Sequence, residues 1–320
     1  MITLDGIGRV AEQFRLAAVG AVTWENALNR MADLTGTRSG QLIGLGAISS
    51  VPMNIMTRLP DEAGPEFVQI GGGDPTVNSR VRVGMSAPEM VFLDQGSFDL
   101  EGDRTRAPEF GAWIDRYSIG YSCITTLLKR SEMLVGLAAI RSISQGEMAA
   151  EQKRAFMTVA AHARAAMVMR NTVEDQAVSL LDTALNRLRA AAVICDPLGK
   201  VKAITEVAEQ IIATERILRL ADGMLMALRP AENRLFQRYL MAALRSRVDP
   251  SVGPPSSIGL TGASGETLTI EFVPLPAQNG FNFAAAVMVV LQPNCRQPDL
   301  LRQVHEVLPL GGSSFRTVTL

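Results

Sequence analysis

The chain has 320 residues and a formal net charge of −1, with 47% hydrophobic and 20% charged residues. This length suits two domains, and the apolar content excludes an intrinsically disordered chain. A nucleic-acid-binding domain usually carries a basic excess, which this chain lacks.

Metal, disulfide and membrane classes are also disfavoured. The three cysteines, Cys123, Cys195 and Cys295, are far apart, whereas a zinc cluster or a disulfide framework needs closely paired spacings. No uncharged apolar run reaches the ~18 residues that span a bilayer, and charges interrupt the apolar N-terminal residues, unlike a signal peptide. We therefore expect a cytoplasmic protein with no membrane contact, no metal and no cofactor.

Apolar spacing predicts a mixture of helices and strands in the first half of the chain. The predicted elements are a helix over 6–34 that ends at Gly36, strands over Ser39–Ser50 and Glu66–Ile70, an extended stretch at Val91–Asp94, a helix over Pro108–Gly120, and strands over Tyr121–Lys129 and Met133–Ser142. The short polar link between the last two strands predicts a hairpin.

A long helix is the strongest local prediction. Ser144 and Glu147 have the spacing of a capping box, and no glycine or proline follows until Pro197, so the helix can run from Glu147 to about Arg189. Its second half carries apolar residues at spacings of four, three, four and four, which are Val173, Ala177, Leu180, Ala184 and Leu188. This seam predicts a homodimer through a short coiled coil; an amphipathic helix lying on its own domain is an equally open alternative.

The second half reads as strands with few helices between them. A strand over Ala190–Asp196, a turn at Asp196–Gly199 and a return strand over Lys200–Thr205 are followed by helical residues to about Ala221. A short strand, a helix from Pro230, a hairpin around Gly262–Gly265 and a last strand complete the pattern. Successive strands without intervening helices predict an antiparallel sheet with helices on one face, which makes the chain α+β.

Candidate catalytic residues are few. His162 and His305 are the only histidines, and neither has a readable nucleophile or orienting acid near it in sequence. The glycines at Gly71–Gly73 are not followed by the Lys-Ser/Thr of a phosphate-binding loop, so a turn is predicted there. We expect that the chain is not an enzyme.

The opening of the second half, "AAVICDPLGKVKAIT" (191–205), resembles the strand-turn-strand hairpin that opens PAS domains. The segment "ADGMLMALRP" (221–230) is similar to a middle strand of those domains. Thr205 stands where that family commonly has an asparagine. The resemblance implies a PAS-like module over 190–293.

The first half resembles the GAF-like sensor region that precedes a PAS module in bacterial LuxR-type transcription regulators. "WENALNRMADLTGTRSGQL" (24–42) is similar to the entry helix and first strand, and "GLAAIRSISQGEMAAEQKRAFMTVAAHARAAMVM" (136–169) is the closest match. In that segment His162 and Arg164 resemble a recurrent His-x-Arg pattern, preceded here by Ala161 where the family has proline. In this family a helix-turn-helix follows the PAS module, but only the lead-in "PDLLRQVHEV" (298–307) is similar here.

The resemblance implies four segments and a function. These are a GAF-like sensor domain with an N-terminal helix over 1–172, a connecting helix over 173–189, a PAS-like domain over 190–293, and a tail over 294–320 that is the remnant of the lead-in to a missing helix-turn-helix. We expect a sensory region that binds a small-molecule effector or a partner, acts as a homodimer and does not bind DNA by itself. The alternative is a scaffold or dimerisation protein with filled cores and no ligand.

Aromatic residues beside the predicted strands are the candidate ligand contacts. Rings with polar tips suit a small apolar ligand, although they can equally fill a core. The candidates are Phe92, Trp113, Tyr117 and Tyr121.

Overall fold

A computed structural model describes residues 2–46, 51–130, 133–246, 257–262, 265–275 and 285–293 of the chain. These residues form two compact units, one up to Val173 and the other from Glu174 onward. The predicted tail over 294–320 lies outside the described residues. None of the described helices is long and apolar enough to cross a membrane.

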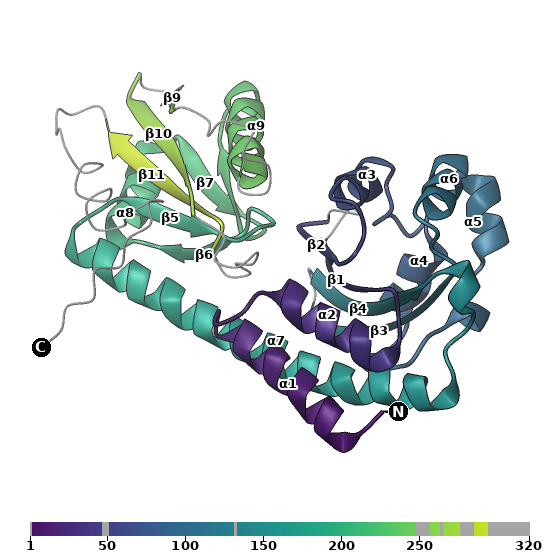
Figure 1. Ribbon diagram of the computed structural model, residues 1–320. Coiled ribbons are helices and arrows are strands. Elements are labelled where there is room, and N and C mark those ends of the chain that lie inside the picture. The colour runs from purple at the N-terminus through teal and green to yellow at the C-terminus, as the bar shows by residue number, and fades with distance from the viewer. Residues whose placement is uncertain are drawn as a thin grey trace, which may run out of the picture. The chain divides into compact units, whose positions relative to one another are not determined.

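The first unit is built on a four-stranded antiparallel sheet in the order β2-β1-β4-β3 (Figure 1). Its strands are β1 (Ser39–Gly46), β2 (Met53–Met56), β3 (Tyr121–Lys129) and β4 (Met133–Arg141). The predicted hairpin is confirmed, because β3 pairs with β4 and Tyr121 lies opposite Arg141.

Helices cover both faces of this sheet (Figure 1). One face carries α1 (Leu4–Ala18), α2 (Trp24–Thr35) and the first half of α7 (Ala150–Arg187); the other carries α3 (Ala63–Gln69), α4 (Ser79–Ser86), α5 (Leu100–Arg106) and α6 (Pro108–Arg116). Side chains on a strand alternate between faces. A Cβ on Gly40 would meet Leu28 and Met31 of α2, whereas Ile43 packs against the cluster around Phe110 on the opposite side.

Two predicted elements of this unit are wrong. Residues 66–70 were expected to form a strand, but residues 66–69 lie in α3 and Ile70 caps it; the ring of Phe67 in this helix lies 5.3 Å from that of Trp113. The apolar residues Phe67, Val68 and Ile70 have strand propensity, but burial of one ring among helices outweighs it. The helix predicted over 6–34 is two helices, separated at Gly20 with a φ of 79°.

The long helix also begins later than predicted. A short 3-10 turn, η3 (Ile143–Gln145), lies where the predicted cap of the long helix was expected. This turn is capped by Ser142 instead of Ser144, and the Ser142 N–H donates to Gln145 Oε1 at 2.9 Å. Gly146 has a φ of 63°, which an α-helix cannot continue through, so α7 starts at Ala150.

The second unit contains a five-stranded antiparallel sheet in the order β6-β5-β11-β10-β9 and a separate β7-β8 hairpin. The bounds are β5 (Ala192–Cys195), β6 (Val201–Ile204), α8 (Glu206–Glu215), β7 (Leu218–Ala221), β8 (Met224–Ala227), α9 (Pro230–Ser246), β9 (Ile258–Thr261), β10 (Thr267–Pro274) and β11 (Val287–Pro293). The turn at Asp196–Gly199 is formed as predicted, since Asp196 Oδ1 accepts hydrogen bonds from the N–H groups of Leu198 and Lys200.

Both faces of this second sheet are covered, contrary to the prediction of helices on one face. Val193 and Cys195 face a core that includes Phe236 of α9, while Ala192 and Ile194 pack with Val178 and Leu185 of α7. The helix predicted to continue to Ala221 ends at Glu215, because Arg216 adopts a left-handed conformation with a φ of 48° and the chain turns into β7.

The close approach at Gly120 provides a test of the first unit's packing. A Cβ at this position would lie 2.5 Å from the backbone nitrogen of Ile143, so we expect Gly120→Ala to destabilise the fold by about 1–3 kcal/mol. A Cβ added at Gly8, an exposed position in α1, would have no neighbouring atom within 4 Å. Gly8→Ala should therefore stabilise the fold by about 0.5–1 kcal/mol. Urea denaturation of both variants checks this; equal effects from the two would contradict the packing described.

Candidate functional site

A cavity lies between the sheet of the first unit and the helices α3, α4 and α6. Its volume is about 80 Å³, measured as the space open to the centre of a water-sized sphere. Protein interiors are close-packed with few voids larger than one water molecule, and a site for one water needs only about 10–15 Å³ by this measure. The space therefore exceeds an ordinary packing defect.

Most of the cavity wall is apolar. The helices contribute Phe67, Phe110 and Trp113, and the strands contribute Ile43, Ile124 and Ala138. The rings of Phe110 and Trp113 stack with centroids 6.0 Å apart and planes at 9°. Trp113 Nε1 donates to the carbonyl of Ala63 at 3.2 Å, so its polar atom is satisfied away from the cavity.

The polar side chains of the wall are mostly committed to bonds within the protein. Asn78 Nδ2 donates to the Gly72 carbonyl at 2.8 Å, Thr126 Oγ1 to the Gly84 carbonyl at 3.0 Å, and Gln41 Nε2 to Asn54 Oδ1 at 2.8 Å. Among the described lining residues, two buried side-chain atoms lack a hydrogen-bond partner: Arg80 Nη2 and Thr125 Oγ1.

Arg80 is the charged residue among the described residues of this mostly apolar wall. Its Nε donates to Ser122 Oγ of β3 at 2.6 Å, and its guanidinium carbon lies 5.8 Å from the centre of the Phe98 ring. Burial lowers the pKa of Arg80 to about 10, against the attraction of Asp103 and aided by repulsion from Arg104. The guanidinium is therefore still charged near neutral pH, and part of the residue's surface remains accessible where it lines the cavity.

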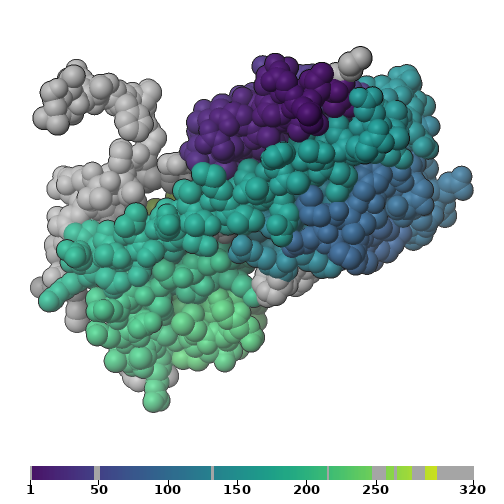
Figure 2. Space-filling model, turned by 90° about the horizontal axis from the view of Figure 1, so that it is seen from below, coloured from purple at the N-terminus to yellow at the C-terminus, as the bar shows by residue number. Residues whose placement is uncertain are grey.

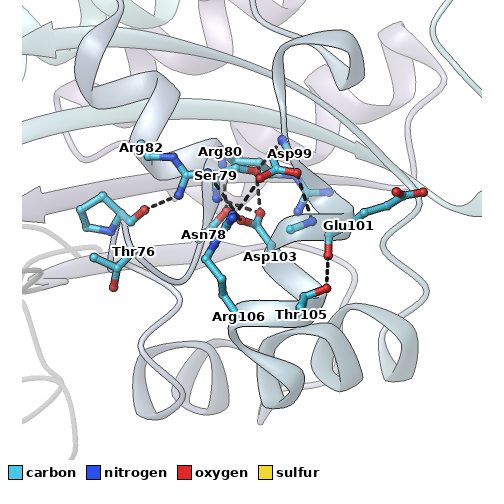
Figure 3. A network of polar contacts seen from close by, with 12 residues as sticks. Thr76, Asn78, Ser79, Arg80, Arg82, Asp99, Glu101, Asp103, Thr105 and Arg106 are labelled. Atoms are coloured by element: carbon cyan, nitrogen blue, oxygen red, sulfur yellow. Dashed lines mark hydrogen bonds and ion pairs between the residues drawn. The ribbon is translucent and has the colours of Figure 1, made fainter.

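A buried carboxylate positions the helix that carries Arg80 (Figure 3). Asp103 is fully buried and accepts hydrogen bonds from Ser79 N at 2.8 Å and Ser79 Oγ at 2.5 Å. Its other oxygen pairs with Arg106 at 2.8 Å, and Asn78 Oδ1 caps α4 by accepting from Arg80 N at 3.0 Å. Asp103 is therefore saturated by α4 and by its own helix, and it makes no direct bond to the Arg80 side chain.

The structure brings one of the four predicted ligand contacts to the cavity. Trp113 lines it, whereas Tyr117 packs behind Trp113 with ring centres 5.5 Å apart and donates its hydroxyl to Glu66 Oε2. Phe92 lies beside Phe156 of α7, with ring centres 6.3 Å apart, and Tyr121 opens β3; neither is part of the wall.

Sequence reasoning missed Arg80, although a signal was present. Arg80 is four residues before Gly84 in a short helix, so the two lie on the same side of it, and Gly84 is buried. A charged residue on such a face is unusual enough to mark a site. Within the described residues, no three His, Cys, Asp or Glu side chains gather in a way that would hold a metal ion.

The predicted dimerisation seam on α7 is exposed in the single chain. Figure 2 looks onto the helix, which runs as a teal band open to view. All five seam residues are exposed, Leu180 by 73%, while Val178 and Leu185 on a different stripe are buried against the second sheet. The helix thus packs on its own unit and still leaves the seam free, so the two alternatives do not exclude each other.

The Asp103 network makes a stability prediction. We expect Asp103→Asn to cost about 2–4 kcal/mol, because it removes charge-assisted bonds from a buried site. The matched control is Asp115→Asn, which removes an exposed ion pair with Arg104 and should cost less than about 1 kcal/mol. Urea denaturation measures both; comparable losses would mean that Asp103 does not anchor α4.

No family model matches the chain, and no curated protein matches it. Among solved structures, the ligand-binding domain of VqsR from Pseudomonas aeruginosa is 12% identical with a TM-score of 0.38 and covers 52% of this chain and 94% of its own. The N-acylhomoserine lactone dependent LuxR-family transcription factor CepR2 from Burkholderia cenocepacia is 17% identical with a TM-score of 0.36, covering 49% and 94%. A GAF domain/HD domain protein from Geobacter sulfurreducens is 10% identical with a TM-score of 0.30, covering 52% and 94%. These identities and scores assign the chain to none of these families.

Proposed function

We propose that the first unit is a sensor domain that binds a small-molecule effector in its cavity. The observation that supports this is the partly open cavity itself, bounded by stacked aromatic rings and by the half-buried Arg80, one of whose nitrogens has no hydrogen-bond partner. Small-molecule sites are typically concave and mostly apolar, with a few polar groups that orient the ligand. A scaffold with filled cores, the competing prediction, leaves this space unexplained.

The second unit and α7 complete the proposal. We interpret the five-stranded antiparallel sheet as a PAS-like module and α7 as the connector between it and the GAF-like sensor unit. Effector binding would bias the conformation of the sensor unit, and the helix would carry that bias to a second copy or to an output partner. The proposed setting is a cytoplasmic transcription regulator of the LuxR type, in which this region has the sensory role.

Filling the cavity tests the proposed binding site. Benzamide, an uncharged probe with an aromatic ring, should raise the melting temperature of the wild type, since ligand at ten times Kd stabilises a protein by about 1.4 kcal/mol. Ala138→Leu adds three carbon atoms at the lining and should abolish the shift while the variant stays folded. Ala21→Leu, the same change at an exposed position, should keep it. A shift that survives Ala138→Leu would place the binding elsewhere.

The exposed seam generates a second test. We propose that two copies pair through Val173, Ala177, Leu180, Ala184 and Leu188. A triple change to glutamate at Ala177, Leu180 and Ala184 should convert a dimer into a folded monomer, measured by size-exclusion chromatography with light scattering. Glutamates at three exposed positions on another side of the same helix, Thr172, Ser179 and Thr183, should leave the dimer intact. A monomeric wild type would rule out this assembly.

A further inference from the structure

We propose that the effector of this cavity carries a carboxylate, and that Arg80 binds it. The inference rests on the proposed function, because it names the chemical class of the ligand for the same cavity. It concerns a compact monoanion with an apolar or aromatic body, rather than a neutral molecule.

The first step is the incomplete bonding of Arg80. A guanidinium has five N–H donors in a fixed fork, and here Nε is used by Ser122 Oγ while Nη2 is buried without a partner. An unmade hydrogen bond on a buried charged group is costly. A ligand that accepts a hydrogen bond from Nη2 would remove this cost. That hydrogen bond would therefore contribute to the affinity of the ligand.

The second step is that no carboxylate bonds directly to Arg80. None of the described residues places a carboxylate within ion-pair distance of its guanidinium; Asp103 attracts that charge, but its oxygens bond Ser79 and Arg106 and pair with Arg82 at 3.7 Å (Figure 3). The charge therefore faces a wall of low polarity, where electrostatic attraction is stronger than in water. An incoming anion would be balanced one to one by this cation.

The third step selects a carboxylate among anions. Arginine matches the planar carboxylate with parallel hydrogen bonds, and one guanidinium balances a single negative charge. A phosphate carries up to two charges, whereas Arg80 is the single cation among the described residues of the wall. The remaining wall, with Phe67, Phe110 and Trp113, suits an apolar body.

A purely structural role for Arg80 is the interpretation to be excluded. Its bond to Ser122 links α4 to β3 whether or not a ligand binds, so loss of stability in a variant proves nothing about recognition. The test is therefore a preference between two ligands of equal shape, which a structural role alone would not produce.

Benzoate and benzamide form such a pair, since they differ mainly in charge. We expect the wild type to bind benzoate at least ~10-fold more tightly than benzamide by isothermal titration calorimetry at neutral pH, because charge-assisted hydrogen bonds are about twice as strong as neutral ones. Arg80→Gln should remove the preference and keep benzamide binding within about 3-fold. Arg80→Lys should retain part of it, and Arg9→Gln, at an exposed position of α1 outside the wall, should retain all of it.

The outcomes separate the two proposals. Equal binding of benzoate and benzamide by the wild type, with both abolished by Ala138→Leu, would overturn the role of Arg80 and leave the cavity as a ligand site. No binding of either probe would overturn the proposed function as well. The comparison of the two probes on the wild type needs no variant, so it tests the proposal even if the Arg80→Gln protein does not fold.

Discussion

The buried carboxylate of Asp103 is the interaction on which the helical cover of the first unit depends. α4 and α5 are only eight and seven residues long, and helices of this length are marginal without tertiary support. Asp103 supplies that support by accepting from both donors of Ser79 at the start of α4 while it pairs with Arg106 one turn along α5. Because polar bonds support α4 in addition to the apolar packing of Val81, the space beneath this helix need not be completely filled for the fold to persist.

Small residues keep that space open. Gly84, Gly136 and Ala138 all lie in the cavity wall, and a Cβ on Gly84 would meet nothing closer than Ile124 at 3.6 Å. On the other face of the sheet the opposite holds, since a Cβ on Gly40 would come within 3.2 Å of Leu28 and Met31. The same sheet is therefore tightly packed against α2 and incompletely packed under α4 and α6, so the cavity lies on one face of the sheet.

The elements that the sequence predicted correctly are those whose stabilising contacts are close together in the chain. The β3–β4 hairpin and the Asp196 turn were predicted because their partners are neighbours in the chain, and the α+β class followed from the order of strands. The helix α3 was not, because the ring that holds Phe67 belongs to Trp113, almost fifty residues later. The role of Arg80 in the cavity wall was not predicted for the same reason, since its hydrogen-bond partner Ser122 is 42 residues away in the chain. The exposed seam of α7 was readable from spacing alone, whereas its second, buried stripe depends on strands that follow it.

The continuity of α7 determines what kind of motion can pass along it. Its 38 residues extend for about 57 Å at 1.5 Å per residue, with no glycine or proline at which the backbone could bend freely. Phe156 is buried in the core of the first unit, and Leu185 packs against the second sheet. Because the hydrogen-bonded helix is continuous between them, a change of its direction would have to be a gradual curve rather than a sharp bend.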